Sequence, residues 1–315
     1  MDITGLVSSL SGSTARAATP LIFAAAGEVL VQRSGVVNVG LEGILLGSAF
    51  TATIVTYTTH NPWLGLIAAL ITGGIMAAIF SAFTIYGAAD QVVVGVVLNL
   101  FALGVTGTLF RILFATHAAK TMELPFVFHT IPILTPFTLA AVAVVWYILY
   151  KTRLGLEIRA CGEKPSAAAA SGVNVLKLRT LVTVFGGVLA GAGGAFLSIG
   201  QNNAFAENMS AGRGFIALAI VTAGRWNPIG CLIAALVFGL SDALQFLGQA
   251  IGLDHYYRLL LIHLHLLTVA KQFNVNHVPY NLFLAVPYVV TLVILLGSSK
   301  STRAPASLGK PYVRI

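Results

Sequence analysis

The sequence predicts an all-α, polytopic membrane protein with about 8–10 transmembrane or re-entrant helices in two positional halves. Of its 315 residues, 57% are apolar and only 9% are charged, and the mean hydropathy is +0.90. Soluble domains carry about 25% charged residues, so this composition excludes a soluble fold. Long apolar stretches recur along the chain, and we expect residues 1–315 to form a single transmembrane domain.

The apolar segments can be compared with the roughly 20 residues that a membrane helix needs. Ala17–Val31 and Phe215–Ala223 are too short to span comfortably. Leu259–Ala270 contains His263 and His265, and we expect it at the outer surface, because one more crossing would put the basic tail outside. The segments expected to cross are Val39–Tyr57, Trp63–Tyr86, Val92–Ala115, Ile133–Tyr150, Leu181–Gly200, Ile229–Ile251 and Val278–Leu296.

Basic residues predict the orientation. Ten of the 18 Lys and Arg residues lie in Lys151–Thr180 and in the tail after Gly297. Loops that stay in the cytoplasm carry an excess of positive charge, so we expect a cytoplasmic loop at residues 151–180 and a cytoplasmic tail at residues 298–315. Within the loop, Pro165 and Gly172 bracket a run of Ser and Ala, which predicts a short helix. An ordered basic loop of this kind is expected to bind a partner.

Two short apolar regions are interrupted by Gly, Asn and Pro: Gly27–Gly43 near the start and Ser210–Gly230 near the end. Unwound backbone at membrane depth is tolerated only where it is buried in protein or lines an aqueous cavity. Paired interruptions in two halves are typical of transporters that hold their solute at the interruptions. The positions of these regions therefore predict a transporter built from two repeats, and we expect its solute path near the first interruption.

Polar residues in the first interruption are candidates for that path. Asn38 and Glu42 are the candidates there, since an ionisable group inside a membrane is a functional candidate by default and Asn38 lies in the same broken stretch. A helix that starts near Asn38 would place Glu42 in its first turn or two, where the helix dipole stabilises a carboxylate. Glu42 is therefore interpreted equally as a cap, as a partner for Arg33 or as part of the solute path.

Further polar residues lie inside the longer segments. Asn99 could bind sugar hydroxyls or a base edge, or could form a hydrogen bond between helices. For Asp242 we favour a polar contact with another helix over an ion-coupling site. Glu28 is interpreted as a boundary charge, and Arg111 is expected to snorkel outward.

Motifs for catalysis, cofactors and metals are not found. The sequence has no HExxH, CxxC or GxxxxGK[ST] pattern, and it predicts no catalytic residue, cofactor or metal ligand. Cys161 and Cys231 offer no disulfide framework. The basic loop and tail explain much of the net charge of +8, so no nucleic acid is expected as a partner. Gly187, Gly191 and Ala195 stand four residues apart, which predicts close packing between helices.

Several motifs together carry a resemblance to a known family. The chain resembles the permease subunits of ABC importers of the branched-chain amino acid and ribose class, and most of all the nucleoside and simple-sugar permeases. The resemblance implies a bacterial inner-membrane subunit in contact with lipid, a second permease subunit, two ATP-binding subunits and an extracytoplasmic solute-binding lipoprotein. The motifs are SGVVNVGLEG at 34–43, QVVVGVVLNL at 91–100, GLEIRACGEKP at 155–165, GRWNP at 224–228 and RAPASLGKP at 303–311.

The same resemblance implies which residues contact the ATPases. In the family, the loop that matches Gly155–Gly172 contains the coupling helix, and Ser166 stands where importers often carry Glu. Residues 252–277 are longer than the family would suggest, and we interpret them as an extracytoplasmic insertion. The residues implied in coupling are Gly155, Arg159, Gly162, Pro165, Ala167, Ala168 and Gly172.

The resulting hypothesis is a permease subunit of an ATP-driven importer of nucleosides or related simple sugars. The chain has no ATP site of its own but has an ordered basic loop, so ATP hydrolysis is expected in separate subunits. The alternative is an ion-coupled secondary transporter of small polar solutes that uses Asp242 and Glu42. A membrane scaffold without transport is a third possibility, against which the polar residues inside the spans argue.

Overall fold

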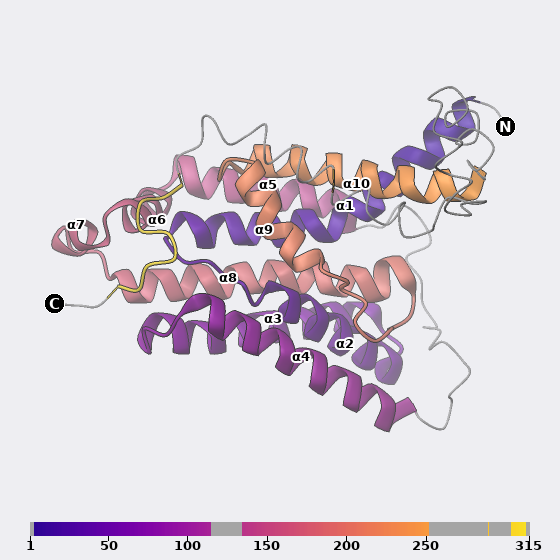
Figure 1. Cartoon of the computed structure of the whole chain (residues 1–315), viewed down its shortest axis with the longest axis horizontal. Helices are drawn as coiled ribbons and strands as arrows, with labels where there is room; N and C mark the ends of the chain where they lie inside the picture. The colour runs from indigo at the N-terminus through magenta and orange to yellow at the C-terminus, as the bar shows by residue number, and fades with distance from the viewer. Residues whose placement is uncertain (1–2, 115–133, 252–288, 290–303, 313–315) are drawn as a thin grey trace, which may run out of the picture.

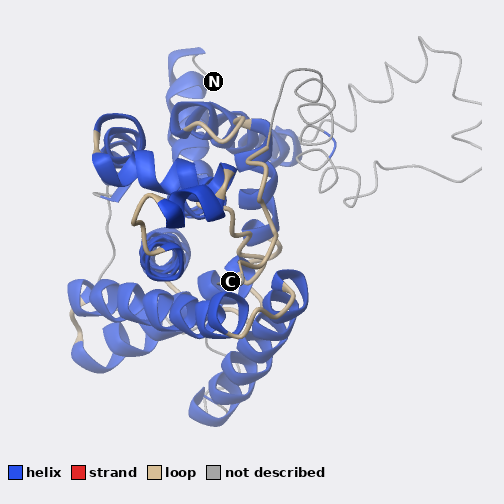
Figure 2. Ribbon diagram, turned by 90° about the vertical axis from the view of Figure 1, so that its left-hand side faces the viewer, coloured by secondary structure: helices blue, strands red, loops and turns tan. Residues whose placement is uncertain are grey.

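The computed structural model describes residues 3–114, 134–251, 289 and 304–312. Within these ranges all regular structure is helical and no strand is present (Figure 2), which confirms the predicted fold class. Two π-helical segments, η1 (Ala82–Tyr86) and η3 (Phe196–Asn202), extend the helices before them. The helices are α1 (Ile3–Arg33), α2 (Leu41–Thr59), α3 (Pro62–Ser81), α4 (Gln91–Phe114), α5 (Leu134–Lys151), α6 (Arg153–Glu163), α7 (Pro165–Ala170), α8 (Val175–Ala195), α9 (Arg213–Ala223) and α10 (Pro228–Ile251).

Six helices in the described residues are long and apolar enough to cross a membrane. They are α1, α2, α3 with η1, α4, α8 with η3, and α10. Helices α5 and α6 meet at a bend of 76° and together form one further candidate. The 11 residues of α9 rise only about 16 Å, roughly half of the hydrocarbon core. The prediction that this segment is too short to span is confirmed.

Helix α8 packs against α1, α2 and α3. Small residues allow this close approach. A Cβ added to Gly27 would lie 2.5 Å from the carbonyl oxygen of Gly186, and one added to Gly191 would lie 2.5 Å from that of Ala69. The predicted stripe of Gly187, Gly191 and Ala195 is thereby confirmed as a packing surface, since backbones can approach only where side chains are small.

The two ends of the bundle differ in what they carry (Figure 1). Helices α6 and α7 and residues 304–312 gather at one end, which we call the α6–α7 end. The last turns of α4 and the connection between η3 and α9 lie at the opposite end. Between the ends, α3 and α4 expose apolar side chains such as Ile71 and Leu100, which are 56% and 63% exposed. An apolar surface of this kind is suited to lipid or to another membrane subunit.

The first helix is longer than predicted. The expected segment Ala17–Val31 was too short to span, whereas α1 runs from Ile3 to Arg33 and has a candidate span at Leu10–Arg33. The Ser, Thr and Arg residues before Ala17 lower the local hydropathy without breaking the helix. Threonine hydroxyls in this region bond back to carbonyl oxygens one turn earlier, at 2.8 Å for Thr14 and 2.7 Å for Thr19. Their polar atoms are therefore satisfied within the helix.

The predicted loop at residues 151–180 is more ordered than expected. The short helix after Pro165 is confirmed as α7, but α6 precedes it and was not predicted. Thr152 caps α6 by accepting a hydrogen bond from the amide of Gly155 at 3.2 Å. Asn174 caps α8 in the same way, so α8 begins at Val175 and includes residues assigned to the loop.

Some predictions lie outside the described residues. These are the insertion at residues 252–277, the surface helix Leu259–Ala270 with His263 and His265, and the last span Val278–Leu296 apart from residue 289.

Candidate functional site: the junction of two broken segments

Two irregular segments interrupt the bundle. One joins α1 to α2 at residues 34–40, and the other joins η3 to α9 at residues 203–212. Each falls within or overlaps a region where the sequence predicted an interruption, although α1 stays helical up to Arg33. The helices that follow begin side by side, because a Cβ added to Gly214 would lie 2.5 Å from the Cα of Glu42. We call this meeting place the junction.

Glu42 ties the two segments together. Its Oε1 accepts a hydrogen bond from the amide of Gly212, and its Oε2 accepts one from the amide of Gly214, both at 2.7 Å. The first amides of a helix lack partners and carry partial positive charge, so a carboxylate there is strongly favoured. The predicted role as a cap is confirmed, but the capped helix is α9 and not α2. Arg33 is not the partner, since its Nε donates to the carbonyl of Trp226 at 2.8 Å.

Asn99 ties α4 to the first irregular segment. Its Nδ2 donates to the carbonyl of Val39 at 3.0 Å, and its Oδ1 accepts from the amide of Gly43 at 2.8 Å. One amide side chain thus satisfies a carbonyl of the irregular segment and an unpaired amide in the first turn of α2. Of the two predicted uses of Asn99, the hydrogen bond between segments is the one observed.

Asn38 connects the junction to α1. The side chain of Asn38 is fully buried, and its Oδ1 accepts a hydrogen bond from the backbone amide of Gly40 at 3.1 Å. The backbone amide of Asn38 donates to Oε1 of Glu28 at 3.1 Å. Glu28 is also fully buried and accepts from Nε2 of Gln32 at 3.0 Å. The interpretation of Glu28 as a boundary charge is therefore wrong. Its position four residues before Gln32, on one helix face, was the available signal for a buried pair.

Trp226 continues this chain of hydrogen bonds beyond α9. Its Nε1 donates to Oε1 of Gln32 at 2.7 Å. Both ends of α9 are consequently held by residues from the first quarter of the chain: Glu42 at its start, and Gln32 and Arg33 just after its end. The sequence did not predict the role of Trp226, because the contact joins residues 194 positions apart.

Asp242 flanks the junction without joining the hydrogen bonds above. It lies on α10, is half-buried, and interacts electrostatically with Arg213, the first residue of α9. The neighbouring Ser241 bonds back to the carbonyl of Val237 at 2.9 Å. The structure thus places Asn38, Glu42 and Asn99 around residues 38–43, each bonded to different groups, and Asp242 beside the start of α9.

At the α6–α7 end, the residues implied in coupling have distinct surroundings. Gly155 packs against the carbonyl of Ile148 in the bend between α5 and α6, and Gly162 packs against the carbonyl of Arg33. Arg159 donates to the carbonyl of Gly155 at 3.2 Å and lies 5.5 Å from the ring centroid of Tyr150.

Helix α7 itself presents small residues. Pro165 begins it, and Gly172, with a φ of +93°, follows just after its end. Ala168 is buried and Ala167 is exposed. Residues other than glycine rarely adopt such a positive φ, so Gly172 is required for the turn that leads toward α8.

Arg179 is the residue at this end that sequence reasoning missed. It is only 2% exposed, and its guanidinium donates to the carbonyls of Ser34, Cys161 and Lys310 and to the hydroxyl of Ser307, at 2.9–3.3 Å. In the sequence it is one more basic residue of a basic loop. Its burial follows from the early start of α8.

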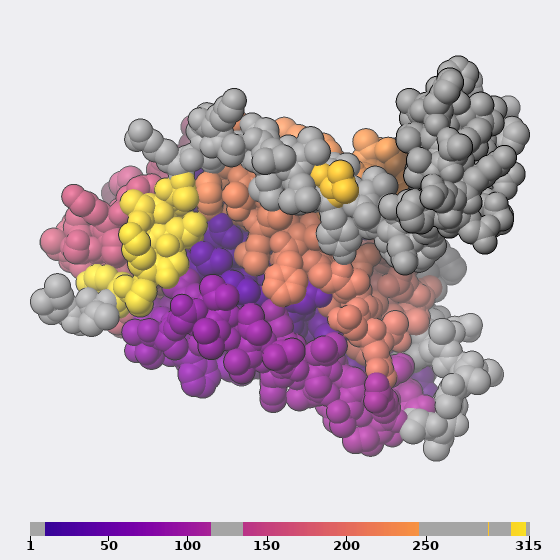
Figure 3. Space-filling model, viewed as in Figure 1, coloured from indigo at the N-terminus to yellow at the C-terminus, as the bar shows by residue number. Residues whose placement is uncertain are grey.

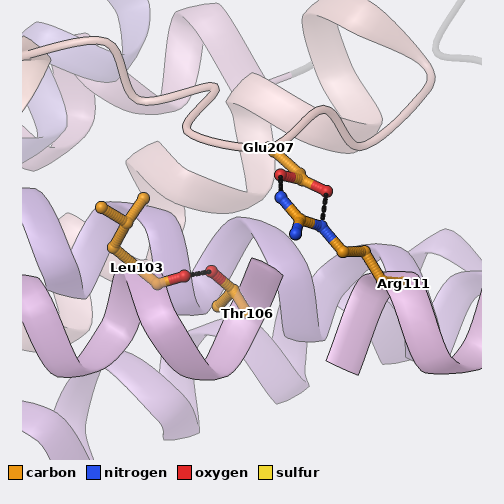
Figure 4. Close-up of polar contacts among 4 residues, drawn as sticks. All are labelled: Leu103, Thr106, Arg111 and Glu207. Atoms are coloured by element: carbon orange, nitrogen blue, oxygen red, sulfur yellow. Dashed lines mark hydrogen bonds and ion pairs between the residues drawn. The ribbon is translucent and has the colours of Figure 1, made fainter. Parts of the chain in front are cut away.

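At the opposite end, Arg111 forms a two-pronged ion pair with Glu207, at 2.8 and 2.7 Å (Figure 4). The side chain of Arg111 is 74% exposed, as expected for outward snorkelling, and the ion pair is a contact that the sequence did not predict. The hydrogen bond from Arg111 holds the pKa of Glu207 below its ordinary value of 4.5. Phe205, two residues earlier, packs its ring 5.1 Å from Phe50 and 5.2 Å from Phe110, measured between centroids. These contacts fasten the second irregular segment to α2 and α4.

Comparison with known proteins identifies the family. The family described as the branched-chain amino acid transport system permease component matches residues 11–295. The chain belongs to this permease family. No solved structure matches the chain.

Relatives match over nearly the full length. The guanosine ABC transporter permease protein NupQ of Bacillus subtilis is 33% identical over 100% of this chain and 99% of its own. The nucleoside ABC transporter permease protein NupC of Lactococcus lactis is 31% identical over 94% of both chains. A second Bacillus subtilis protein, the guanosine permease NupP, is 27% identical over 72% of this chain and 71% of its own.

The comparisons confirm the resemblance found in the sequence. The chain is a multi-pass membrane protein and a permease subunit, which is a transport component and not an enzyme. They support the ABC permease hypothesis and not the ion-coupled alternative.

Proposed function

We propose that this chain is the permease subunit of an ATP-binding cassette importer that moves nucleosides or related simple sugars across the bacterial inner membrane. The observation that carries the proposal is the full-length similarity to a guanosine permease. The occurrence of two guanosine permease relatives in Bacillus subtilis supports pairing with a second, related permease subunit. Two ATP-binding subunits and an extracytoplasmic solute-binding lipoprotein would complete the transporter.

The proposal assigns a side of the membrane to each end. We place the α6–α7 end, with residues 151–174 and the tail, in the cytoplasm, since this end carries the clusters of Lys and Arg. The opposite end then faces the solute-binding lipoprotein. We place residues 252–277 on that outer side as an insertion.

The solute path is proposed to run beside the junction. Polar groups in an otherwise apolar bundle gather there, from Asn38, Glu42 and Asn99, with Asp242 next to the start of α9. Glu42 and Asn99 hold irregular backbone in place, and irregular backbone at membrane depth is a feature of solute paths. In this proposal they position the path and need not touch the solute.

Uptake by reconstituted complexes tests the proposal. The chain would be co-expressed with the proposed partners, a second permease, ATP-binding subunits and a solute-binding lipoprotein from the same organism, and the purified complex would be placed in liposomes. We expect ATP-dependent uptake of labelled guanosine or uridine and weaker uptake of ribose and glucose. Liposomes with a proton or sodium gradient but no ATP are the control. Uptake that follows the ion gradient, or no uptake of any of these solutes, would contradict the proposal.

A substitution on α7 tests the coupling role. Ala167 is exposed, so Ala167→Glu changes the outer face of α7 without filling a buried site. We expect the ATP-binding subunits to co-purify at least several-fold less well. Thr58→Glu, an equally exposed change near the end of α2, is the matched control. If both variants retain the ATP-binding subunits equally, α7 is not the coupling helix.

A further inference from the structure

Residues 304–312 lie against the α6–α7 end, where Figure 3 shows them as a yellow strip beside the pink atoms of α6 and α7. The strip is bonded to α6. The amide of Ser307 donates to the carbonyl of Gly162 at 2.9 Å, and its hydroxyl lies 2.6 Å from the same oxygen. The amide of Ala306 donates to the carboxylate of Glu163 at 3.4 Å. The tail is thus fixed to the last turn of α6, immediately before α7.

The same strip is bonded to the first irregular segment. The amide of Gly309 donates to the carbonyl of Gly35 at 3.0 Å. Gly35 belongs to the stretch that leads from α1 to Glu42 and the junction. Residues 304–312 therefore bridge α6 to the interruption after α1.

Arg179 fastens this bridge from α8. Its Nε donates to the carbonyl of Ser34 at 2.9 Å, and its Nη1 donates to that of Lys310 at 3.2 Å. Its Nη2 reaches both the carbonyl of Cys161 and the hydroxyl of Ser307, each at 3.3 Å. The planar guanidinium offers five donors in a rigid fork, so one side chain can hold three segments in a fixed geometry.

Gly35 shows how tightly the three segments meet. Its φ is +95°, and a Cβ at this position would lie 2.5 Å from Nη2 of Arg179 and 2.8 Å from the hydroxyl of Ser307. Any side chain here would displace the fork, the hydroxyl or both. Gly162 makes a second close contact, against the carbonyl of Arg33. The backbones of α6 and of the end of α1 are therefore packed too closely for a side chain to fit between them.

From these contacts we propose that residues 304–312 and Arg179 form a brace that passes the movement of α6 and α7 to the segment at residues 34–40, and so to the junction. Arg179 and Ser307 are then positioning residues for transport. This inference rests on the proposed function, because it takes the ATP-binding subunits as the source of the movement. Coupling between distant sites is carried by contiguous packed and hydrogen-bonded groups of this kind.

Hydrogen exchange tests the brace without reference to transport. The variants are Ser307→Ala, which removes the hydroxyl, and Gly35→Ala, which displaces the fork. Lys310→Ala and Lys177→Ala are matched controls, since both side chains are exposed and the carbonyl of Lys310 is kept. In the purified chain we expect amides at 35–43 to exchange about tenfold faster in both test variants, with α3 unchanged. Exchange at 35–43 equal to that of the controls would overturn the brace.

Transport by the reconstituted complex supplies the second readout. We expect Ser307→Ala to retain the ATP-binding subunits and to hydrolyse ATP, while solute moved per ATP falls about tenfold. Ser307→Thr keeps a hydroxyl and should restore most of the solute moved per ATP. If Ser307→Ala acted only by unfolding the chain, the return of a hydroxyl alone would not be expected to restore this ratio. An unchanged ratio of solute to ATP would overturn the coupling role. If the wild-type complex moves no solute, the proposed function fails, and hydrogen exchange still decides whether the brace exists.

Discussion

The two ends of the bundle each use an arginine to tie an irregular segment to a helix, but in opposite surroundings. Arg179 at the α6–α7 end is 2% exposed and is bound by backbone carbonyls and one hydroxyl. The side chain of Arg111 at the opposite end is 74% exposed and is paired with a carboxylate. By formal charge the second contact is the stronger one, because it joins opposite charges.

Surroundings reverse that order. An exposed ion pair gains little, since water and salt screen both charges. A buried network gains little when it forms but is costly to break, since each acceptor left without a donor has lost its water. The contacts of Arg179 at the α6–α7 end are therefore costlier to break than the exposed ion pair of Arg111 at the opposite end.

Replacing Arg179 should have the largest effect. Arg179→Met keeps the length of the side chain and removes every donor, so the carbonyls of Ser34, Cys161 and Lys310 lose a partner. We expect a loss of about 3–5 kcal/mol in stability, since each buried acceptor left without a donor costs about 1–3 kcal/mol, measured by thermal unfolding of the detergent-solubilised chain. Lys177→Met, on the same helix but exposed, should change it by less than about 0.5 kcal/mol. Equal effects in the two variants would refute the contrast between the ends.

Replacing Glu42 should have an intermediate effect. Glu42→Ala leaves the amides of Gly212 and Gly214 without an acceptor at the start of α9, at an expected loss of about 1–2 kcal/mol. Glu42→Gln keeps one acceptor and should lose less. Asp90→Ala is the control, because Asp90 caps α4 through the amides of Val92 and Val93 but is exposed. A loss for Asp90→Ala as large as for Glu42→Ala would show that burial does not set the strength of a cap here.

Opening the Arg111–Glu207 pair should have the smallest effect. Arg111 lowers the pKa of Glu207, so the pair stabilises the fold above the ordinary pKa of 4.5 and loses this contribution as the pH falls through the lowered value. Thermal unfolding of wild type and Arg111→Gln should differ slightly at pH 7 and converge in acid or in high salt. Arg111→Lys, which keeps the charge but not the fork, should lie between them. A difference that persists in acid would mean that Arg111 acts through packing.

Local patterns in the sequence predicted much of this fold. The apolar segments, the caps of α7, the small-residue surface of α8 and the two interruptions are all set by residues near one another in the chain. Pro165 and Gly172 bound α7, because proline fixes φ near its helical value and glycine readily adopts the positive φ that ends the helix. Asn38, Glu42 and Asn99 were found because polar groups are rare inside membrane segments.

The partners of these residues could not be predicted in the same way. Glu42 caps a helix 170 residues later, and Arg179 gathers oxygens from Ser34 to Lys310. A pattern of neighbouring residues holds no information about contacts between residues so far apart in the chain. Glu28 was misplaced because its spacing from Gln32 shows only that the two can pair, whereas its burial depends on Asn38 and on the packing of α1 among its neighbours. The length of α1 was underestimated because hydropathy counts hydroxyls as polar even where the helix satisfies them.

The cap on α9 has a consequence for how the protein is made. An 11-residue helix is too short to enter a membrane by itself, and the amides at its start find no acceptor among lipid chains. Glu42 leaves the ribosome 170 residues earlier than the first of these amides. The acceptor for these amides is therefore already synthesised when α9 emerges, so the order of synthesis suits the assembly of this junction.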